Sequence, residues 1–218
     1  MKPKVFFLEV IIVVIGVSLA FFAENKRQKY LNKKTENYYA KGLILDLEHN
    51  LEEIKFNYKA DSIAYIKLNT ISNDVRSDNF SLDSLFNVII HFWYSRSIIF
   101  HESTYQEMVS RGDISLIQND SLRPMIIDYF GYYDGVQYVE NHNSNMVTGL
   151  GIPYIISNID LINLSNSNST HNQSAVSKPE FFNMVIFFMG FIEDRMHVYN
   201  VFHEKNRQLL YTLKEHYN

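Results

Sequence analysis

The side chains best suited to metal chemistry are acid and histidine pairs at helical spacing. Glu193 and His197 are four residues apart, and Asp46 and His49 are three apart, so each pair would share one face of a helix. Such pairs can ligate zinc or iron, but a di-iron helical bundle needs a Glu-x-x-His motif on each of two helices. The sequence contains no such motif. We therefore expect no metal centre.

Other catalytic arrangements are equally weak. The serines occur in segments typical of helix caps and loops, without the glycine-flanked turn that presents a nucleophile, and no glycine-rich phosphate loop is found. The absence of cysteine excludes disulfides, thiolate metal sites and cysteine catalysis. A formal net charge of −4 gives no basic field for nucleic acid. We predict a protein that is not an enzyme, has no cofactor and does not bind nucleic acid.

One carboxylate lies inside an apolar run. Residues 5–23, VFFLEVIIVVIGVSLAFFA, are apolar except for Glu9 and Ser18. As a helix this run would be about 28 Å long, the thickness of the hydrocarbon core of a bilayer. The apolar side chains outweigh the cost of one acid, so the run predicts a transmembrane helix at 5–23. A cleaved signal peptide is the alternative, because Ser18 and Ala20 fit a small-x-small cleavage pattern.

The acid shares a helical face with small residues. Gly16, Ala20 and Ala23 follow Glu9 at spacings that place all four on one side of the helix. Gly16 and Ala20 form a small-xxx-small pair, which permits close approach of a second helix. We predict that Glu9, Gly16, Ala20 and Ala23 form a membrane-helix association face. Two alternatives remain for Glu9, a position at the headgroup layer without specific contacts and a role in proton translocation.

Helical periodicity continues beyond the run. Between residues 24 and 70 there is no proline, and apolar residues recur at steps of three and four. We expect the membrane helix to continue as a long amphipathic stalk that packs through Ile44, Leu47, Leu51, Ile54 and Tyr58.

The rest of the chain also predicts helices. Capping residues and glycines favour helices at about 82–95, 103–111, 120–145 and 178–217. The run FFNMVIFFMGFI in the last of them is too short to cross a bilayer, and predicts the central, fully buried helix of a bundle. A Ser- and Asn-rich stretch at about 163–177 predicts a flexible loop. The fold class is therefore all-α, with residues 24–218 forming one antiparallel helical bundle domain.

Tyrosine and phenylalanine gather in one predicted helix, at Tyr129, Phe130, Tyr132, Tyr133 and Tyr138. Packing between helices is one interpretation, and an exposed patch for a partner or ligand is the other.

Three segments carry a resemblance to a known family. LEVIIVVIGVSLAF, GLILDLEHNLEEI and STYQEMVSRGDISLIQNDSLRPMIIDYF together resemble an uncharacterised family of short single-pass membrane proteins from Bacteroidota. The match covers about residues 5–145 and includes Glu9, Ser103, Thr104, Tyr105, Gly112, Leu116 and Ile117. The resemblance implies no activity, and it implies an N-terminus inside the cell with the bulk of the chain in the periplasm. Lys26, Arg27, Lys29, Lys33 and Lys34 follow the run, which by the positive-inside rule alone favours the opposite orientation.

These observations lead to one expected function and one alternative. We expect a single-pass protein of the bacterial inner membrane that contacts lipid and works by association, as a homo-oligomer or as an accessory subunit of a larger envelope complex. The alternative is an extracytoplasmic helical bundle that senses a ligand and signals through a partner.

Overall fold

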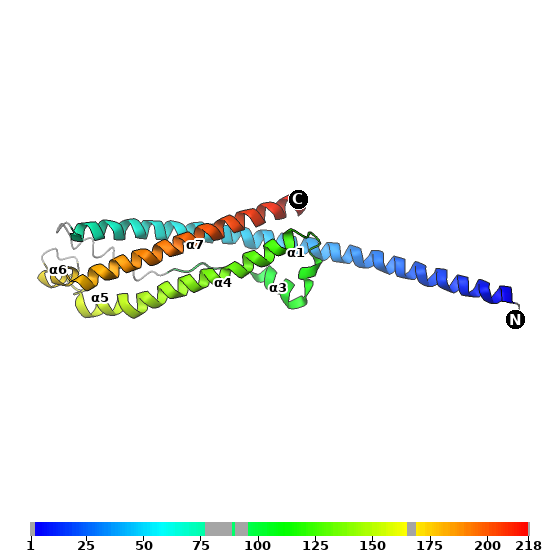
Figure 1. Cartoon of the computed structure of the whole chain (residues 1–218), viewed down its shortest axis with the longest axis horizontal. Coiled ribbons are helices and arrows are strands. Elements are labelled where there is room, and N and C mark those ends of the chain that lie inside the picture. Colours follow the sequence, from blue (N-terminus) through cyan, green and yellow to red (C-terminus); the bar gives the residue numbers. More distant parts are fainter. Residues whose placement is uncertain (1–2, 77–88, 90–95, 165–168, 218) are drawn as a thin grey trace.

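A computed structural model of the chain describes residues 3–76, 89, 96–164 and 169–217, and the side chains among these except those of residues 3–8, 10, 75 and 76. All regular structure in these residues is helical, so the predicted all-α class is confirmed. The elements are α1 (Pro3–Arg76), α3 (Ser103–Arg111), η1 (Asp113–Leu116), α4 (Leu122–Met146), η2 (Val147–Gly151), α5 (Ile152–Asn158), α6 (Thr170–Val176) and α7 (Pro179–Tyr217) (Figure 1).

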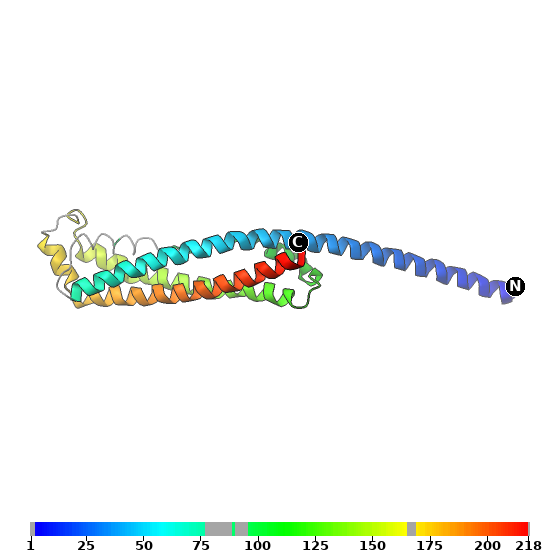
Figure 2. The same ribbon diagram turned by 90° about the horizontal axis from the view of Figure 1, so that it is seen from above.

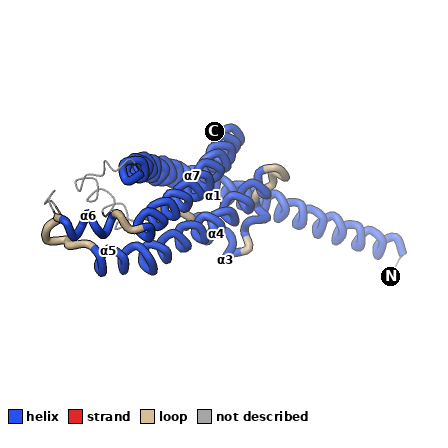
Figure 3. Tube along the Cα trace, turned by 60° about the vertical axis from the view of Figure 1, so that its left-hand side comes forward, coloured by secondary structure: helices blue, strands red, loops and turns tan. Residues whose placement is uncertain are grey.

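The long helices lie side by side. α1 and α4 run in the same direction, and α7 returns antiparallel to them and packs along both (Figures 1 and 2). α5 and α6 close the end of the bundle where α1 finishes (Figure 3). The N-terminal part of α1 projects from the opposite end, beside α3 and the C-terminus of α7. α1 is therefore one continuous helix of 74 residues, about 111 Å long, that is packed over only part of its length.

A heptad pattern explains how α1 packs. Its buried residues alternate at steps of four and three from Glu36 to Ile71, which keeps them on one seam of the helix. Polar residues interrupt this seam at Asn50, Asn57 and Asp61, all less than 5% exposed. The seam is therefore as regular as that of a coiled coil but includes amide and carboxyl groups.

The other two long helices follow the same spacing. In α7 the buried positions run from Phe181 to Leu213 and include the polar residues Arg195 and Asn206. In α4 they run from Leu122 to Asn143 and include Glu140. Three seams with a shared period pack at a shallow angle over a long distance, which produces an elongated bundle.

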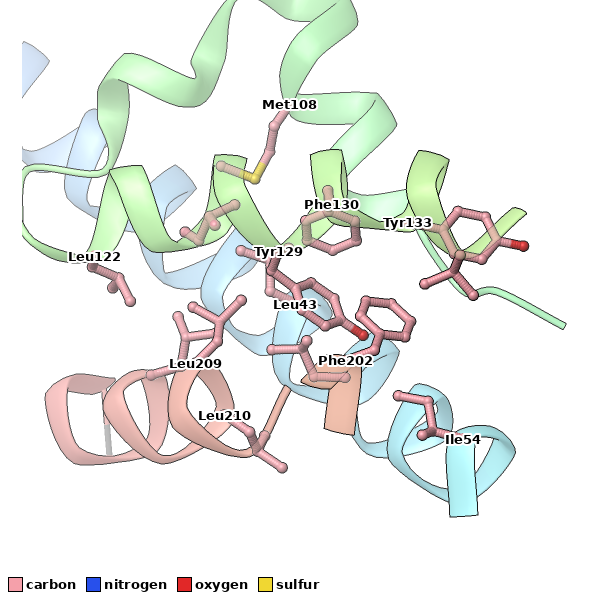
Figure 4. Packing of buried hydrophobic residues seen from close by; sticks show 14 of the residues in the cluster. Leu43, Ile54, Met108, Leu122, Tyr129, Phe130, Tyr133, Phe202, Leu209 and Leu210 are labelled. Carbon is pink, nitrogen blue, oxygen red and sulfur yellow. The ribbon is translucent and has the colours of Figure 1, made fainter. Parts of the chain in front are cut away.

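The core consists of two apolar clusters. The first lies near α5 and α6 and contains Leu68, Val147 and Phe181. The second lies nearer the projecting part of α1, where Leu43, Tyr129 and Phe202 turn toward one another between α1, α4 and α7 (Figure 4). The rings of Tyr129 and Phe202 stack with centroids 4.9 Å apart. Asn57, Asp61, Glu140, Asn143 and Arg195 lie between these clusters, whereas Asn50 and Asn206 lie within the second.

The aromatic residues of α4 are mainly part of the core. Tyr129, Phe130 and Tyr133 are buried and Tyr132 is half-buried, whereas Tyr138 is 71% exposed. Packing between helices therefore accounts for most of this group.

The predicted loop at about 163–177 is wrong in its second half, where α6 forms. The Ser169 hydroxyl oxygen accepts a hydrogen bond from the backbone N–H of Asn172 and caps this helix. Asn172 is fully buried and its side chain bonds both the N–H and the C=O of Asp160. A polar residue is buried here because the backbone of another segment satisfies its amide.

The prediction that α7 begins as a fully buried helix is also wrong. Phe181, Val185 and Phe188 lie in the core, but Ile186 and Phe187 are exposed. The bundle surrounds this helix on one side only, so the remaining apolar residues face outward. The predicted helix at about 82–95 lies outside the described residues except for Ile89.

Within the described part of the chain no single helix combines the length and hydropathy of a span, whereas α6 and α7, which meet at a bend of 59°, reach them together. Most of the side chains at the start of the predicted 5–23 span, those of residues 5–8 and 10, lie outside that description.

Candidate functional site

The projecting part of α1 carries the predicted association face. Glu9, Gly16, Ala20 and Ala23 are all exposed. A Cβ atom added at Gly16 would meet nothing within 4 Å. The structure therefore places these four residues on one open side of a helix, where no other described element of the chain covers them.

Large apolar side chains surround this face. Exposed residues occur at almost every position from 11 to 22: Ile11, Ile12, Val13, Val14, Ile15, Val17, Leu19, Phe21 and Phe22. Because successive residues in a helix are rotated by about 100°, these side chains cover its whole circumference. Contiguous apolar surface of this kind marks a site of contact with protein or lipid.

The predicted stalk residues lie in or beside the second apolar cluster. Leu47 and Ile54 are buried, and Ile44 and Leu51 are half-buried against it. Tyr58 is 39% exposed and lies off the seam. The neighbouring buried position is Asn57, whose side chain donates to the backbone carbonyl of Glu53 at 2.9 Å.

A buried ion pair joins α1 to α7. Both nitrogens of one edge of the Arg195 guanidinium donate to the Asp61 carboxylate, with Nε and Oδ2 2.8 Å apart. Both side chains are almost fully buried. Burial raises the pKa of Asp61 even though the guanidinium acts to lower it. Burial would lower the pKa of Arg195, but its bonds to Asp61 outweigh this, so the arginine remains charged.

A second buried acid, Glu140 on α4, interacts electrostatically with both charges of this pair. We call Asp61, Arg195, Glu140 and Tyr199 the polar layer. One oxygen of Glu140 accepts hydrogen bonds from the Tyr199 hydroxyl at 2.6 Å and from the backbone N–H of Ile98 at 2.9 Å. Burial raises the pKa of Glu140, while these two donors act to lower it. The layer therefore connects α1, α4, α7 and the extended segment before α3.

Side chains of α1 bind the backbone of that extended segment, residues 96–102. The Asn50 amide donates to the carbonyl of His101 at 2.8 Å and accepts from its N–H at 2.7 Å. Asp46 accepts from the N–H of Thr104 at 3.0 Å, at the start of α3. A non-helical segment inside a bundle needs such partners, because its buried backbone groups have no helix or sheet to pair with.

Polar contacts of Glu36 join α1 to its neighbours at the end of the bundle from which the N-terminal part of α1 projects. The buried carboxylate of Glu36 accepts hydrogen bonds from the Tyr217 hydroxyl at 2.7 Å and from the N–H of Gln118 at 3.2 Å, and pairs with Lys33. Burial acts to raise the pKa of Glu36, but these donors together bring it below its usual value. The projecting helix is thus joined to α7 and to the segment before α4.

The predicted acid and histidine pairs do not form metal sites. Asp46 accepts a hydrogen bond from the backbone N–H of Thr104, and His49 packs beside His101 with ring centroids 5.0 Å apart. Among the described residues, no group of three His, Asp or Glu side chains could hold a metal ion.

Sequence reasoning missed the polar layer. Asp61, Glu140 and Arg195 are spread over 134 residues of the chain, and none belongs to a short motif. Their positions in the heptad seams were the available signal. Comparisons with protein-family models, with curated proteins and with solved structures found no match.

Proposed function

We propose that this chain is a membrane-anchored helical interaction protein, with residues 5–23 in the bacterial inner membrane and the bundle outside the bilayer. Its work is association, either with further copies or as an accessory subunit of an envelope complex. Lipid and the transmembrane helices of other subunits are the partners.

One observation carries this proposal. The apolar side chains of residues 11–22 are exposed around the whole circumference of α1, while the same helix is packed against the bundle from Glu36 onward. A helix with apolar residues on every side is stable in lipid or among other helices, because water does not solvate that surface favourably. Glu9, Gly16, Ala20 and Ala23 supply the side on which a second helix can approach closely.

The test begins with full-length protein from the native membrane. Anchorage predicts that the protein stays in the membrane fraction after alkaline extraction. Purification in a mild detergent and measurement of particle mass then reveal whether it is associated. We expect Gly16→Ile to reduce the mass of the assembly, since a branched side chain at Gly16 prevents close helix approach.

A matched control lies on the opposite side of the helix. Ser18 is also small and exposed, and it is rotated by about 180° from Gly16. Ser18→Ile should leave the assembly mass unchanged. Equal masses for the wild type and Gly16→Ile would contradict the association face, and release of the protein by alkaline extraction would contradict the anchorage. A monomer purified with a bound small molecule would instead favour the ligand-sensing alternative.

The orientation is a separate part of the proposal. Following the family resemblance, we place the bundle in the periplasm. Protease added to intact spheroplasts should then degrade the bundle, and protection until the membrane is permeabilised would reverse this orientation.

A further inference from the structure

The segment of α1 between the apolar run and the bundle is rich in positive charge. We call this segment, residues 24–35, the neck. Its only carboxylate is Glu24, and it contains five cations: Lys26, Arg27, Lys29, Lys33 and Lys34. All five are exposed. A net positive segment of this density attracts anions.

Two of the cations already have partners. Arg27 pairs with Glu24 at 2.7 Å, and Lys33 turns toward Glu36 at the end of the bundle. Lys26, Lys29 and Lys34 have no acidic partner among the described residues. These three lysines are therefore available to an external anion.

The distances of Lys26 and Lys29 from the apolar run match the polar layer of a membrane, whereas Lys34 lies about 16 Å beyond Ala23 along the helix. The Lys26 ammonium lies 4.9 Å from the centroid of the Phe22 ring, so this side chain points back toward the run. Lys29 follows Ala23 by about 9 Å along the helix, close to the depth of about 5–7 Å that headgroups add on each side of the hydrocarbon core. Tyr30, 70% exposed, is an aromatic residue of the kind enriched at this level.

Resting on the membrane anchorage proposed above, we propose that the neck binds anionic phospholipid headgroups through Lys26 and Lys29, with Lys34 adding electrostatic attraction from just outside the headgroup layer. A lysine ammonium attracts a headgroup phosphate as a compact point charge and donates up to three hydrogen bonds to it. Basic segments directly beside a transmembrane helix gain affinity from a leaflet that contains anionic lipid.

A second copy of this chain is a poorer occupant. Parallel association through the membrane face would bring two necks together, with like charges side by side and little acid to offset them. Anionic lipid removes this repulsion. It therefore also permits the helix association that the membrane face predicts.

The test measures lipid binding to the full-length protein. Delipidated protein in mild detergent is titrated with phosphatidylglycerol or with phosphatidylcholine, and native mass spectrometry counts the molecules retained. We expect the wild type to prefer phosphatidylglycerol and the preference to fall as salt is raised. The triple variant K26Q/K29Q/K34Q should bind phosphatidylglycerol about tenfold or more weakly.

A matched control removes the same charge from another part of α1. Lys41, Lys55 and Lys59 are exposed on the bundle part of the helix, and K41Q/K55Q/K59Q should bind phosphatidylglycerol as the wild type does. Equal binding of the two lipids by the wild type, or unchanged binding by the neck variant, would overturn the inference. So would a neck variant that keeps its lipid but loses a co-purifying acidic protein.

Vesicle flotation distinguishes this result from failure of the anchorage. Wild type and neck variant should both enter phosphatidylcholine vesicles when detergent is removed, because the apolar run is unchanged. If the wild type enters neither phosphatidylcholine vesicles nor mixed vesicles with phosphatidylglycerol, the membrane anchorage fails and the lipid site fails with it.

Discussion

Residues 36–72 of α1 lie in the bundle, where every third or fourth side chain is buried, whereas residues 11–31 of the same helix are exposed on all sides. The buried part contains Glu36, Asn50 and Asp61, and the exposed part contains a run of valine, isoleucine and phenylalanine. This reverses the usual distribution of polar and apolar residues in water. The polar residues are buried because other elements bind them. The apolar residues are covered by no other described element of this chain.

The largest loss of stability is expected from changes to the ion pair between Asp61 and Arg195. Asp61→Ala leaves the Arg195 charge buried without its partner, and we expect it to lower the free energy of unfolding by about 3–5 kcal/mol. The double variant Asp61→Leu with Arg195→Met should recover most of this loss, because it removes both charges. Thermal unfolding of the full-length protein in mild detergent, followed by circular dichroism, measures both. A single variant as stable as the wild type would show that the pair does not hold the helices together.

A second variant tests the extended segment. Asn50→Ala deprives the N–H and C=O of His101 of their partner, which should cost about 2–3 kcal/mol. Asn57 is the control, since it lies on the same seam but bonds only its own helix in the contacts described. Amide exchange at His101 should accelerate in Asn50→Ala and not in Asn57→Ala. Equal exchange rates would assign Asn50 a packing role only.

Gly42 of α1 lies against Thr104 of α3. A Cβ at this position would lie 2.6 Å from Oγ1 and 2.8 Å from Cγ2 of Thr104. The overlap outweighs the higher helix propensity of alanine, so Gly42→Ala should lower the free energy of unfolding by about 1 kcal/mol. In a Thr104→Ala background, which leaves only the Cβ of residue 104 close, at 3.3 Å, the same change should cost less. An equal loss in both backgrounds would mean that the contact with Thr104 is not what requires glycine.

The polar layer also predicts a dependence on pH. Because burial raises the pKa of Glu140, the folded protein binds this proton more tightly than the unfolded chain does. Its contribution to stability is present below the ordinary glutamate pKa and is lost as pH rises through the raised value. Glutamine does not ionise, so Glu140→Gln should not show this loss. The melting temperature of the variant minus that of the wild type should therefore become more positive as pH rises. The exposed Glu193→Gln should follow the wild-type pH profile, and a parallel profile for Glu140→Gln would contradict the prediction.

The smallest effect is expected in the projecting part. Leu19 is 63% exposed and Leu47 fully buried. Leu19→Ala should change the unfolding of the bundle by less than about 0.5 kcal/mol, whereas Leu47→Ala on the same helix should cost about 2–5 kcal/mol. The same unfolding measurement gives both values. A large effect of Leu19→Ala would mean that the projecting part supports the bundle.

Much of the helical structure could be predicted from local patterns. The short helix from Ser103 and its end at Gly112, which has a φ of 71°, follow from capping and left-handed termination. The start of α4 near Pro124 and the length of α7 follow from proline placement and periodicity. These features depend on residues close together in the chain, so a single sequence contains them.

The packed faces were harder to predict. The apolar stripe at Ile44, Leu51 and Tyr58 follows hydrophobicity, but the seam itself passes through Asn50 and Asn57, one position away. The Asn50 amide is buried because it pairs with the backbone of His101, 51 residues further along the chain. Hydrophobic periodicity cannot reveal a buried polar residue whose partner is a distant backbone group. The polar layer was missed for a related reason, because its side chains pair with each other across 59 to 134 residues of the chain.

Because α1 is unbroken, it fixes the distance between its apolar run and the bundle. The neck of 12 residues in residues 24–35 is about 18 Å long as an unbroken helix. With residues 5–23 in a bilayer, as proposed, it would hold the end of the bundle that carries Glu36 and Tyr217 about 18 Å from the hydrocarbon core. In that arrangement the rigid helix would act as a spacer between the bundle and the bilayer.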